Sequence, residues 1–216
     1  MKEKLLILDM DNTILHSKID FVLMQKDIAT ILEDNGLSNC VHPSLATSML
    51  NFTKDEGFDE ELAKVLWQRI SQIEADGLAQ AQLEPNVCES LAYLSQFANL
   101  AVLSNNSDQA IIDNLQRLGL APYLSLMVGR DSVPYLKPSP SGMLYVKDHF
   151  PKISYNDTLA VGDAMIDAQA AKAAKIGFVA YNHSRKEQWD KWDIVPLLQL
   201  YKWDQQACDS IRRLWQ

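Results

Sequence analysis

Two aspartates one residue apart are the first residues of the chain whose types and spacing could do chemistry. Asp9 and Asp11 stand at the end of a short apolar run, and Asn12 and Thr13 follow directly. Side chains at positions i and i+2 of an extended chain leave on the same face, so the two carboxylates should converge. Two ionised carboxylates in a cleft of low dielectric constant are costly unless a cation lies between them or one keeps its proton. The pair therefore predicts a bound cation or a retained proton.

Two further aspartates could complete a cation site. The stretch "VGDAMID" puts Asp163 at the end of another apolar run and Asp167 one helical turn further on. Carboxylate oxygens without a nearby histidine or cysteine favour Mg²⁺ over zinc. The acids together predict a magnesium site that handles phosphate.

Two other stretches offer donors for phosphate oxygens. In "LSNNS", Ser104 and the backbone N–H groups of Asn105 and Asn106 stand at a strand-to-helix turn, which suits an anion. In "LKPSP", Lys137 precedes Pro138, whose ring favours an extended conformation in the residue before it. A lysine held there could neutralise both a phosphate dianion and the nucleophile beside it.

Five short apolar runs have the pattern of buried strands that would position these residues. They span residues 4–10, 100–106, 125–131, 158–164 and 176–182. Their nearly continuous apolar middles are typical of a parallel sheet covered on both faces. Helical patterns fill the later gaps, and one of them has Ser107 and Asp108 as N-cap candidates and Gly119 as its stop. The alternation predicts a doubly wound α/β fold, whose ligands bind at the carboxyl ends of the strands.

A helical module interrupts this alternation after the first strand. Residues 19–36 and 59–77 both show apolar spacing of helical period, and each ends in a glycine, Gly36 or Gly77. We expect no strand between residues 14 and 99, and a helix over about 86–97 that leads into the second strand. The predicted units are an α/β core domain, residues 1–14 and 85–216, and a helical cap domain, residues 15–84.

The tail from residue 183 has a helical apolar stripe that Pro196 could start. The stripe consists of Leu197, Leu200, Tyr201, Cys208, Ile211 and Leu214. We expect this helix to pack back on the sheet, with a dimer interface as the alternative, so the protein is expected to be a monomer or a homodimer.

Composition limits the partners and the cellular compartment. The 216 residues carry a formal net charge of −8, which disfavours nucleic acids and anionic membranes and favours a small ligand. Cys40, Cys88 and Cys208 are widely spaced, so they are expected to be reduced, mostly buried thiols. The first apolar segment is too short for a signal peptide, and no run approaches a membrane span. We therefore expect a cytoplasmic protein.

Four motifs in order resemble those of the haloacid dehalogenase superfamily of phosphohydrolases. They are "DMDNT", "LSNNS", "LKPSP" and "VGDAMID", and with their spacing they cover residues 4–182. The stretch "DSVPYLKPSP" is similar to the phosphoglycolate phosphatase subgroup, whose helical cap is inserted between the first two motifs. The resemblance implies a Rossmann-like α/β core with a parallel sheet and an inserted helical cap.

The resemblance also implies roles for the first aspartates and a metal. Asp9 would be the nucleophile that forms an aspartyl-phosphate, and Asp11 would protonate the leaving group and later activate water. Thr13 would orient Asp11 or the adjoining loop. Mg²⁺ would be bound by the Asp9 carboxylate, the Asp11 backbone carbonyl and Asp163, together with phosphate and waters.

Further roles follow from the other motifs. Ser104, the Asn105 amide and Lys137 would stabilise the charge on the transferring phosphoryl group. Asp167 would support the metal site or orient Lys137. The chain departs from the family pattern at Asn12, where glycine is commoner, and at His16, where an acidic residue is common in the phosphoglycolate phosphatases.

The expected function is Mg²⁺-dependent hydrolysis of a small phosphomonoester, with phosphoglycolate as the first candidate substrate. Nucleoside monophosphates and sugar phosphates are further candidates. A sugar phosphomutase would use the same motifs, and a catalytically silent binding protein could keep the same fold. A dehalogenase is disfavoured because it needs no acid at position 11, where Asp11 stands.

Overall fold

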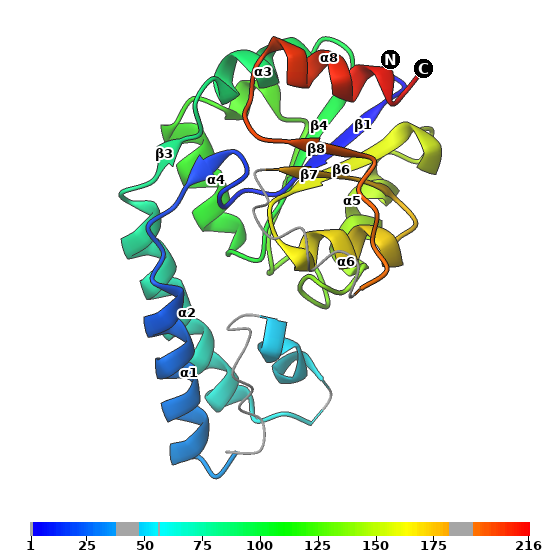
Figure 1. The fold of residues 1–216 in the computed structure, drawn as a ribbon. Helices are drawn as coiled ribbons and strands as arrows, with labels where there is room; N and C mark the ends of the chain where they lie inside the picture. The colour runs from blue at the N-terminus through cyan, green and yellow to red at the C-terminus, as the bar shows by residue number, and fades with distance from the viewer. Residues whose placement is uncertain (1, 38–47, 56, 182–191) are drawn as a thin grey trace.

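In a computed structural model of the protein, residues 2–37, 48–55, 57–181 and 192–216 are described. A six-stranded parallel sheet lies at its centre, in the order β5-β4-β1-β6-β7-β8 (Figure 1). Its strands are β1 (Leu5–Leu8), β4 (Asn99–Leu103), β5 (Leu126–Val128), β6 (Thr158–Gly162), β7 (Gly177–Tyr181) and β8 (Leu198–Leu200). The five predicted strands and the α/β class are confirmed.

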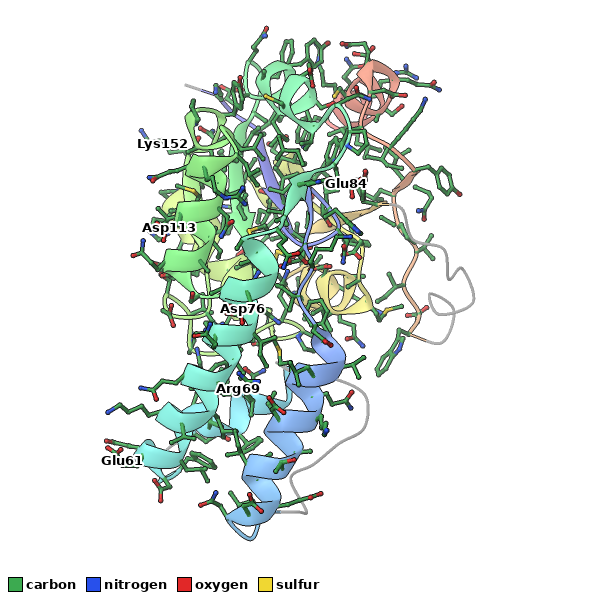
Figure 2. All side chains as sticks on the ribbon, turned by 90° about the vertical axis from the view of Figure 1, so that its left-hand side faces the viewer. Glu61, Arg69, Asp76, Glu84, Asp113 and Lys152 are labelled. Atoms are coloured by element: carbon green, nitrogen blue, oxygen red, sulfur yellow. The ribbon has the colours of Figure 1, made fainter. Side chains whose placement is uncertain are left out.

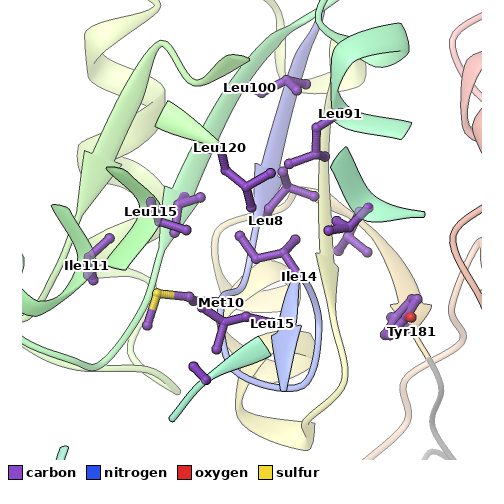
Figure 3. Packing of buried hydrophobic residues seen from close by; sticks show 14 of the residues in the cluster. Leu8, Met10, Ile14, Leu15, Leu91, Leu100, Ile111, Leu115, Leu120 and Tyr181 are labelled. Carbon is purple, nitrogen blue, oxygen red and sulfur yellow. The ribbon is translucent and has the colours of Figure 1, made fainter. Parts of the chain in front are cut away.

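Helices cover both faces of the sheet, as the unbroken apolar strands predict. On one face are α3 (Val87–Leu94), α4 (Asp108–Arg117) and α8 (Gln205–Arg213), and on the other are α5 (Ser141–His149) and α6 (Met165–Ala173). Alternate residues of β1 serve the two faces: Leu6 and Leu8 belong to the first core, and Leu5 and Ile7 to the second. Figure 3 shows Leu8 packed among residues of the first core.

The register of the parallel strands brings their carboxyl ends to one edge. Leu8 is paired with Val102 of β4 on one side and with Val161 of β6 on the other. The residues that follow these three strands therefore emerge next to one another. This edge is where the sequence placed the candidate site.

The helical insertion, which we define as residues 15–84, leaves the core after β1. It contains β2 (Leu15–His16), α1 (Phe21–Asp34), the 3₁₀ segment η2 (Ser48–Lys54), α2 (Glu60–Leu78) and β3 (Gln82–Leu83). Helices α1 and α2 lie side by side and extend away from the sheet (Figure 1). The expectation of no strand here is wrong, because β2 and β3 pair antiparallel where the insertion begins and ends. Two residues are too few to show an alternating pattern in the sequence.

Both insertion helices begin at the aspartate caps that their first turns need. The Asp20 carboxylate accepts a hydrogen bond from Leu23 N at 2.8 Å, and Asp59 caps α2 in the same way.

Gly36 has a positive φ of 75° just after α1, as its predicted role as a helix stop requires. Gly77 is not a stop, because it lies inside α2. A Cβ at Gly77 would lie 2.5 Å from the backbone of Ile19, so this position admits a close approach of two backbones.

The predicted helix from Pro196 is also corrected. Residues 198–200 form β8, which extends the sheet beside β7, and the helix starts only at Gln205. Asp204 caps that helix by accepting a hydrogen bond from Ala207 N at 2.8 Å. Leu197, Leu200 and Tyr201 are spaced as on one face of a helix although this segment is extended, which explains the error.

The tail packs on the core as expected. Trp203 is fully buried, its ring is stacked on Tyr181 at 5.4 Å, and its indole N–H donates to Thr13 O at 2.7 Å. Cys88 and Cys208 are free thiols, the first half-buried and the second buried, whereas Cys40 lies outside the described residues. None of the described helices is long and apolar enough to span a membrane.

Candidate active site

Lys137 is the centre of the charged cluster at the sheet edge. Its ammonium lies 2.6 Å from Asp9 Oδ1, 2.6 Å from Asp167 Oδ1 and 3.1 Å from Leu103 O. The side chain is only 3% exposed, and these acceptors match the three N–H groups of an ammonium. Burial lowers the pKa of Lys137, but the carboxylates of Asp167 and Asp9 outweigh it and raise the pKa above its ordinary value. Lys137 is therefore a permanently charged, fixed cation.

Asp9 has both carboxylate oxygens engaged. Oδ1 contacts Lys137, and Oδ2 accepts a hydrogen bond from Thr13 Oγ1 at 3.2 Å. Thr13, which was expected to orient Asp11 or the adjoining loop, thus contacts Asp9 instead. Burial and the charge of Asp167 raise the pKa of Asp9 to about 6, although Lys137 lowers it. The two contacts fix the orientation of a carboxylate that could act as a nucleophile.

Asp167 contacts Lys137. This contact fits one of the two roles expected for Asp167, which was to orient Lys137. Its second oxygen accepts a hydrogen bond from Ala164 N at 3.1 Å, at the start of α6. Asp167 is buried, where an unbalanced charge would be costly. The ammonium of Lys137 and the N-terminus of α6 balance its charge.

Asp11 is held by a side chain that the sequence interpretation did not use. Asn106 Nδ2 donates to Asp11 Oδ2 at 2.6 Å, whereas only the backbone N–H of Asn106 had been considered. Asp11 Oδ1 is buried and has no hydrogen-bond partner among the described residues. Burial and the charge of Asp9 raise the pKa of Asp11 to about 6, although Ser17 and Asn106 lower it. Such a carboxyl can give up and take back a proton near neutral pH.

Three carboxylates form a group that could hold a cation. Oxygens of Asp9, Asp163 and Asp167 all lie within 4.8 Å of one another. Burial, together with the charges of Asp9 and Asp167, raises the pKa of Asp163 to about 8. With Asp11, four carboxyl groups face the single charge of Lys137, so a cation would offset their repulsion. An all-oxygen donor set fits Mg²⁺.

The "LSNNS" turn holds the backbone of Lys137. The Asn105 side chain accepts from Lys137 N at 2.9 Å and donates to Lys137 O at 3.1 Å. Ser104 is buried at the end of β4, and its hydroxyl accepts from Asn106 N at 3.2 Å. Ser107 caps α4, as predicted, by accepting from Ala110 N at 3.3 Å. Only the backbone N–H of Asn105 was expected to matter. Its side chain, however, orders the loop that carries Lys137.

A buried ion pair joins the helical insertion to this turn. Arg130, which follows β5, places Nη1 2.6 and 2.7 Å from the two oxygens of Glu74 in α2. Its Nη2 donates to Ser71 Oγ at 2.7 Å, and its backbone N–H donates to Asn106 O at 2.9 Å. Burial raises the pKa of Glu74, whereas the charge of Arg130 lowers it. Figure 2 shows α2 running from Glu61 at its outer end to Asp76 near the core, so Glu74 lies at the inner end.

Sequence reasoning missed both members of this pair. Glu74 stands directly after the buried Ile73 and four residues after the buried Ile70, on the apolar side of α2. A charged residue at such a position needs a partner, and that signal could have been used. Its partner lies 56 residues further along the chain, where no local pattern identifies it.

Comparison with known proteins identifies relatives over most of the chain. A family model described as "Haloacid dehalogenase-like hydrolase" matches residues 6–181. "Phosphoglycolate phosphatase 1" of Pseudomonas aeruginosa is 30% identical over 156 residues, which are 70% of this chain and 56% of that protein. "Phosphoglycolate phosphatase" of Pseudomonas savastanoi pv. phaseolicola is 26% identical over 199 residues, which are 84% of this chain and 72% of that protein. The match thus spans little more than half of the first protein and nearly three quarters of the second.

Solved structures share the fold. The HAD-hydrolase YfnB of Bacillus subtilis, in a crystal form described as bound to magnesium, superimposes with a TM-score of 0.64 at 18% sequence identity. The superposition covers all of this chain and 99% of that one. At this identity the likeness concerns the arrangement of helices and strands.

Proposed function

Because the chain belongs to the haloacid dehalogenase-like hydrolase family, we propose that it is a phosphatase that hydrolyses a small phosphomonoester through an aspartyl-phosphate on Asp9. The observation that carries the proposal is the fixed geometry of Asp9 between Lys137 and Thr13. A carboxylate oriented by two donors, with a second acid beside it, is the arrangement that covalent phosphoryl transfer needs. The names of the curated relatives favour the same reaction.

In the first step an Asp9 oxygen forms a bond to phosphorus as the bond from phosphorus to the leaving alkoxide breaks. Asp11, held by Asn106, gives its proton to that alkoxide, and its pKa of about 6 suits this exchange. Oδ1 of Asp11 accepts no hydrogen bond among the described residues, although the Ser17 hydroxyl lowers the pKa of this carboxyl, and a substrate oxygen or water is proposed to contact it.

In the second step water attacks phosphorus and the bond from phosphorus to Asp9 breaks, which releases phosphate. Asp11 now accepts the proton from water. Ser104, the Asn105 amide and Lys137 are proposed to stabilise the charge on the equatorial oxygens of the phosphoryl group throughout. The raised pKa of Lys137 favours its charged form, which suits this role.

We propose Mg²⁺ as the cofactor, held by the Asp9 carboxylate, the Asp11 backbone carbonyl and Asp163. When bound, the ion would reduce the repulsion between nucleophile and phosphate. The crowding of the carboxylates and the raised pKa of Asp163 support a cation here. The related YfnB structure is described as containing magnesium.

The helical insertion is proposed to act as the cap domain, with residues 1–14 and 85–216 as the core domain. Its position beyond the sheet edge would let it exclude water and select the leaving group. Phosphoglycolate is the proposed substrate because curated relatives bear that name.

The decisive experiment is a panel of phosphorylated metabolites, including 2-phosphoglycolate and sugar phosphates, incubated with the purified protein and Mg²⁺. We expect release of free phosphate that stops with chelator and returns with added Mg²⁺. Conversion of a sugar phosphate to its isomer without free phosphate would indicate a mutase instead. A folded protein that releases no phosphate from any of them would contradict the proposal.

A further inference from the structure

Segment 50–55 of the helical insertion contacts the loop that carries Lys137. Asn51 Oδ1 accepts a hydrogen bond from Leu136 N at 2.7 Å, and Asn51 Nδ2 donates to Leu136 O at 3.1 Å. One side chain thus satisfies both backbone polar groups of the residue that immediately precedes Lys137. The contact joins positions 85 residues apart.

The same segment also holds the start of this loop. Lys54 Nζ donates to Arg130 O at 2.6 Å and to Val133 O at 2.8 Å. Burial lowers the pKa of Lys54, and the charge of Asp131 opposes this shift. At the surface, Tyr135 OH donates to Asp55 Oδ1 at 3.1 Å. The loop from Arg130 to Leu136 is therefore attached to the insertion at several points along its length.

The core holds the next residue of the loop in the same manner. Asn105 pairs with the N–H and C=O of Lys137, just as Asn51 pairs with those of Leu136. Two asparagines, one from the insertion and one from the core, fix consecutive residues. The Lys137 ammonium at the end of this arrangement lies 2.6 Å from Asp9.

We propose that Asn51 is a positioning residue for Lys137, so that the helical insertion contributes to the chemical step as well as to the choice of leaving group. This inference rests on the proposed function, in which Lys137 stabilises the transferring phosphoryl group. A loss of the Asn51 contacts leaves the backbone of Leu136 without its partners and lets the loop shift. A shift of about 1 Å in a catalytic group can cost about 100-fold in rate.

The test compares Asn51→Ala with Tyr135→Phe, which removes an exposed hydrogen bond between the same two segments. With a small aryl phosphate and Mg²⁺, Asn51→Ala should lower kcat by about 10- to 100-fold and change KM much less. Tyr135→Phe should stay within about twofold of the parent protein in both constants. Asn51→Asp keeps an acceptor for Leu136 N–H and should lose less activity than Asn51→Ala.

Hydrogen–deuterium exchange of the peptides around residues 130–139 gives a readout that does not depend on activity. If Asn51 positions Lys137, exchange in Asn51→Ala should become faster at Leu136 and also at Lys137, whose amide is bonded to Asn105. Unchanged exchange at Lys137, or an unchanged kcat despite faster exchange, would overturn the inference. If the parent protein releases no phosphate, the proposed function fails separately, and exchange at Lys137 still decides whether Asn51 orders it.

Discussion

Asp9 and Asp11 differ in their surroundings although they are one residue apart in the chain. Asp9 contacts Lys137 and Thr13, whereas Asp11 receives one hydrogen bond from Asn106 and keeps a bare oxygen among the described residues. A fixed carboxylate suits attack on phosphorus, and a carboxyl with an unoccupied oxygen suits proton transfer. The different partners therefore support different proposed roles for the two acids.

Asp9→Asn should lower the turnover of an aryl phosphate by about 1,000-fold or more, because an amide is a poor nucleophile. The protein should remain folded, since the neutral amide removes both the cost of burying the Asp9 charge and the repulsion from Asp167, which together raise the pKa of Asp9. Phosphate release measures activity, and circular dichroism serves as the control for folding. Turnover close to that of the parent protein would remove Asp9 from the nucleophilic role.

Asn106→Ala should shift the pH dependence of kcat/KM. Asn106 lowers the pKa of Asp11 by donating to its charged form, so its removal should raise that pKa above about 6. If protonated Asp11 is the acid, activity is lost as pH rises through this pKa. The descending limb should then move up by about one pH unit.

The matched control for this shift is Asn114→Ala, which removes a side-chain hydrogen bond to Ala110 O in the same helix region. Its pH profile should coincide with that of the parent protein. A profile of Asn106→Ala that does not move, or moves to lower pH, would show that Asp11 does not determine this limb.

Among the structural elements, α2 connects the insertion to the core through a buried ion pair. Its Glu74 and the core residue Arg130 are 1% and 3% exposed, and the pair lies next to the turn that holds Asp11 and Lys137. A second pair, Arg69 with Asp27, joins α2 to α1 at 2.6 Å but is 39% and 24% exposed. The two pairs have the same shortest N···O distance, 2.6 Å, and different burial, which allows a direct comparison.

Arg130→Met should lower the free energy of unfolding by about 3–5 kcal/mol, because it leaves the Glu74 carboxylate buried without its partner. Arg69→Met should cost less than about 1 kcal/mol, because solvent already screens that pair. Urea denaturation followed by fluorescence measures both. If the two substitutions lowered the free energy of unfolding equally, burial would not give the Arg130 pair its expected larger contribution.

At the scale of the whole molecule, the carboxylates of Asp9, Asp163 and Asp167 make the stability of the fold depend on pH and on bound metal. The pKa of Asp9 is raised to about 6 and that of Asp163 to about 8, so the folded protein binds these protons more tightly than the unfolded chain does. Their contribution to stability is present at low pH and is lost as pH rises through the folded pKa values. Between about pH 4 and about pH 8, these two groups should make the metal-free fold progressively less stable.

Mg²⁺ binds the deprotonated carboxylates, so the rise in Tm that it causes should grow from about pH 5 to about pH 8. Thermal scans with chelator or with excess Mg²⁺, taken in steps across this range, measure the difference. Asp163→Asn is the control and should abolish most of the Mg²⁺ effect. A Tm shift that is independent of pH, or retained in Asp163→Asn, would rule out this cluster as the metal site.

The sequence by itself determined the class of the fold and the strand ends at which the candidate residues stand. Strands buried on both faces leave unbroken apolar runs, and in a parallel sheet the polar residue after each run emerges at one edge. Asp9, Ser104 and Asp163 could therefore be placed at this edge from the sequence. β8 escaped this reasoning, because Leu197, Leu200 and Tyr201 have helical spacing and were therefore assigned to the helix of the tail.

Only the tertiary structure decided which side chains hold these residues in place. Asn106 contacts Asp11 across 95 positions, and Asn51 contacts Leu136 across 85. Arg130 finds Glu74 on a different helix. Each contact depends on the packing of the insertion and the turns against the sheet edge, and local spacing carries no information about such packing. The sequence determines which chemical groups are present, whereas the fold determines how they are oriented.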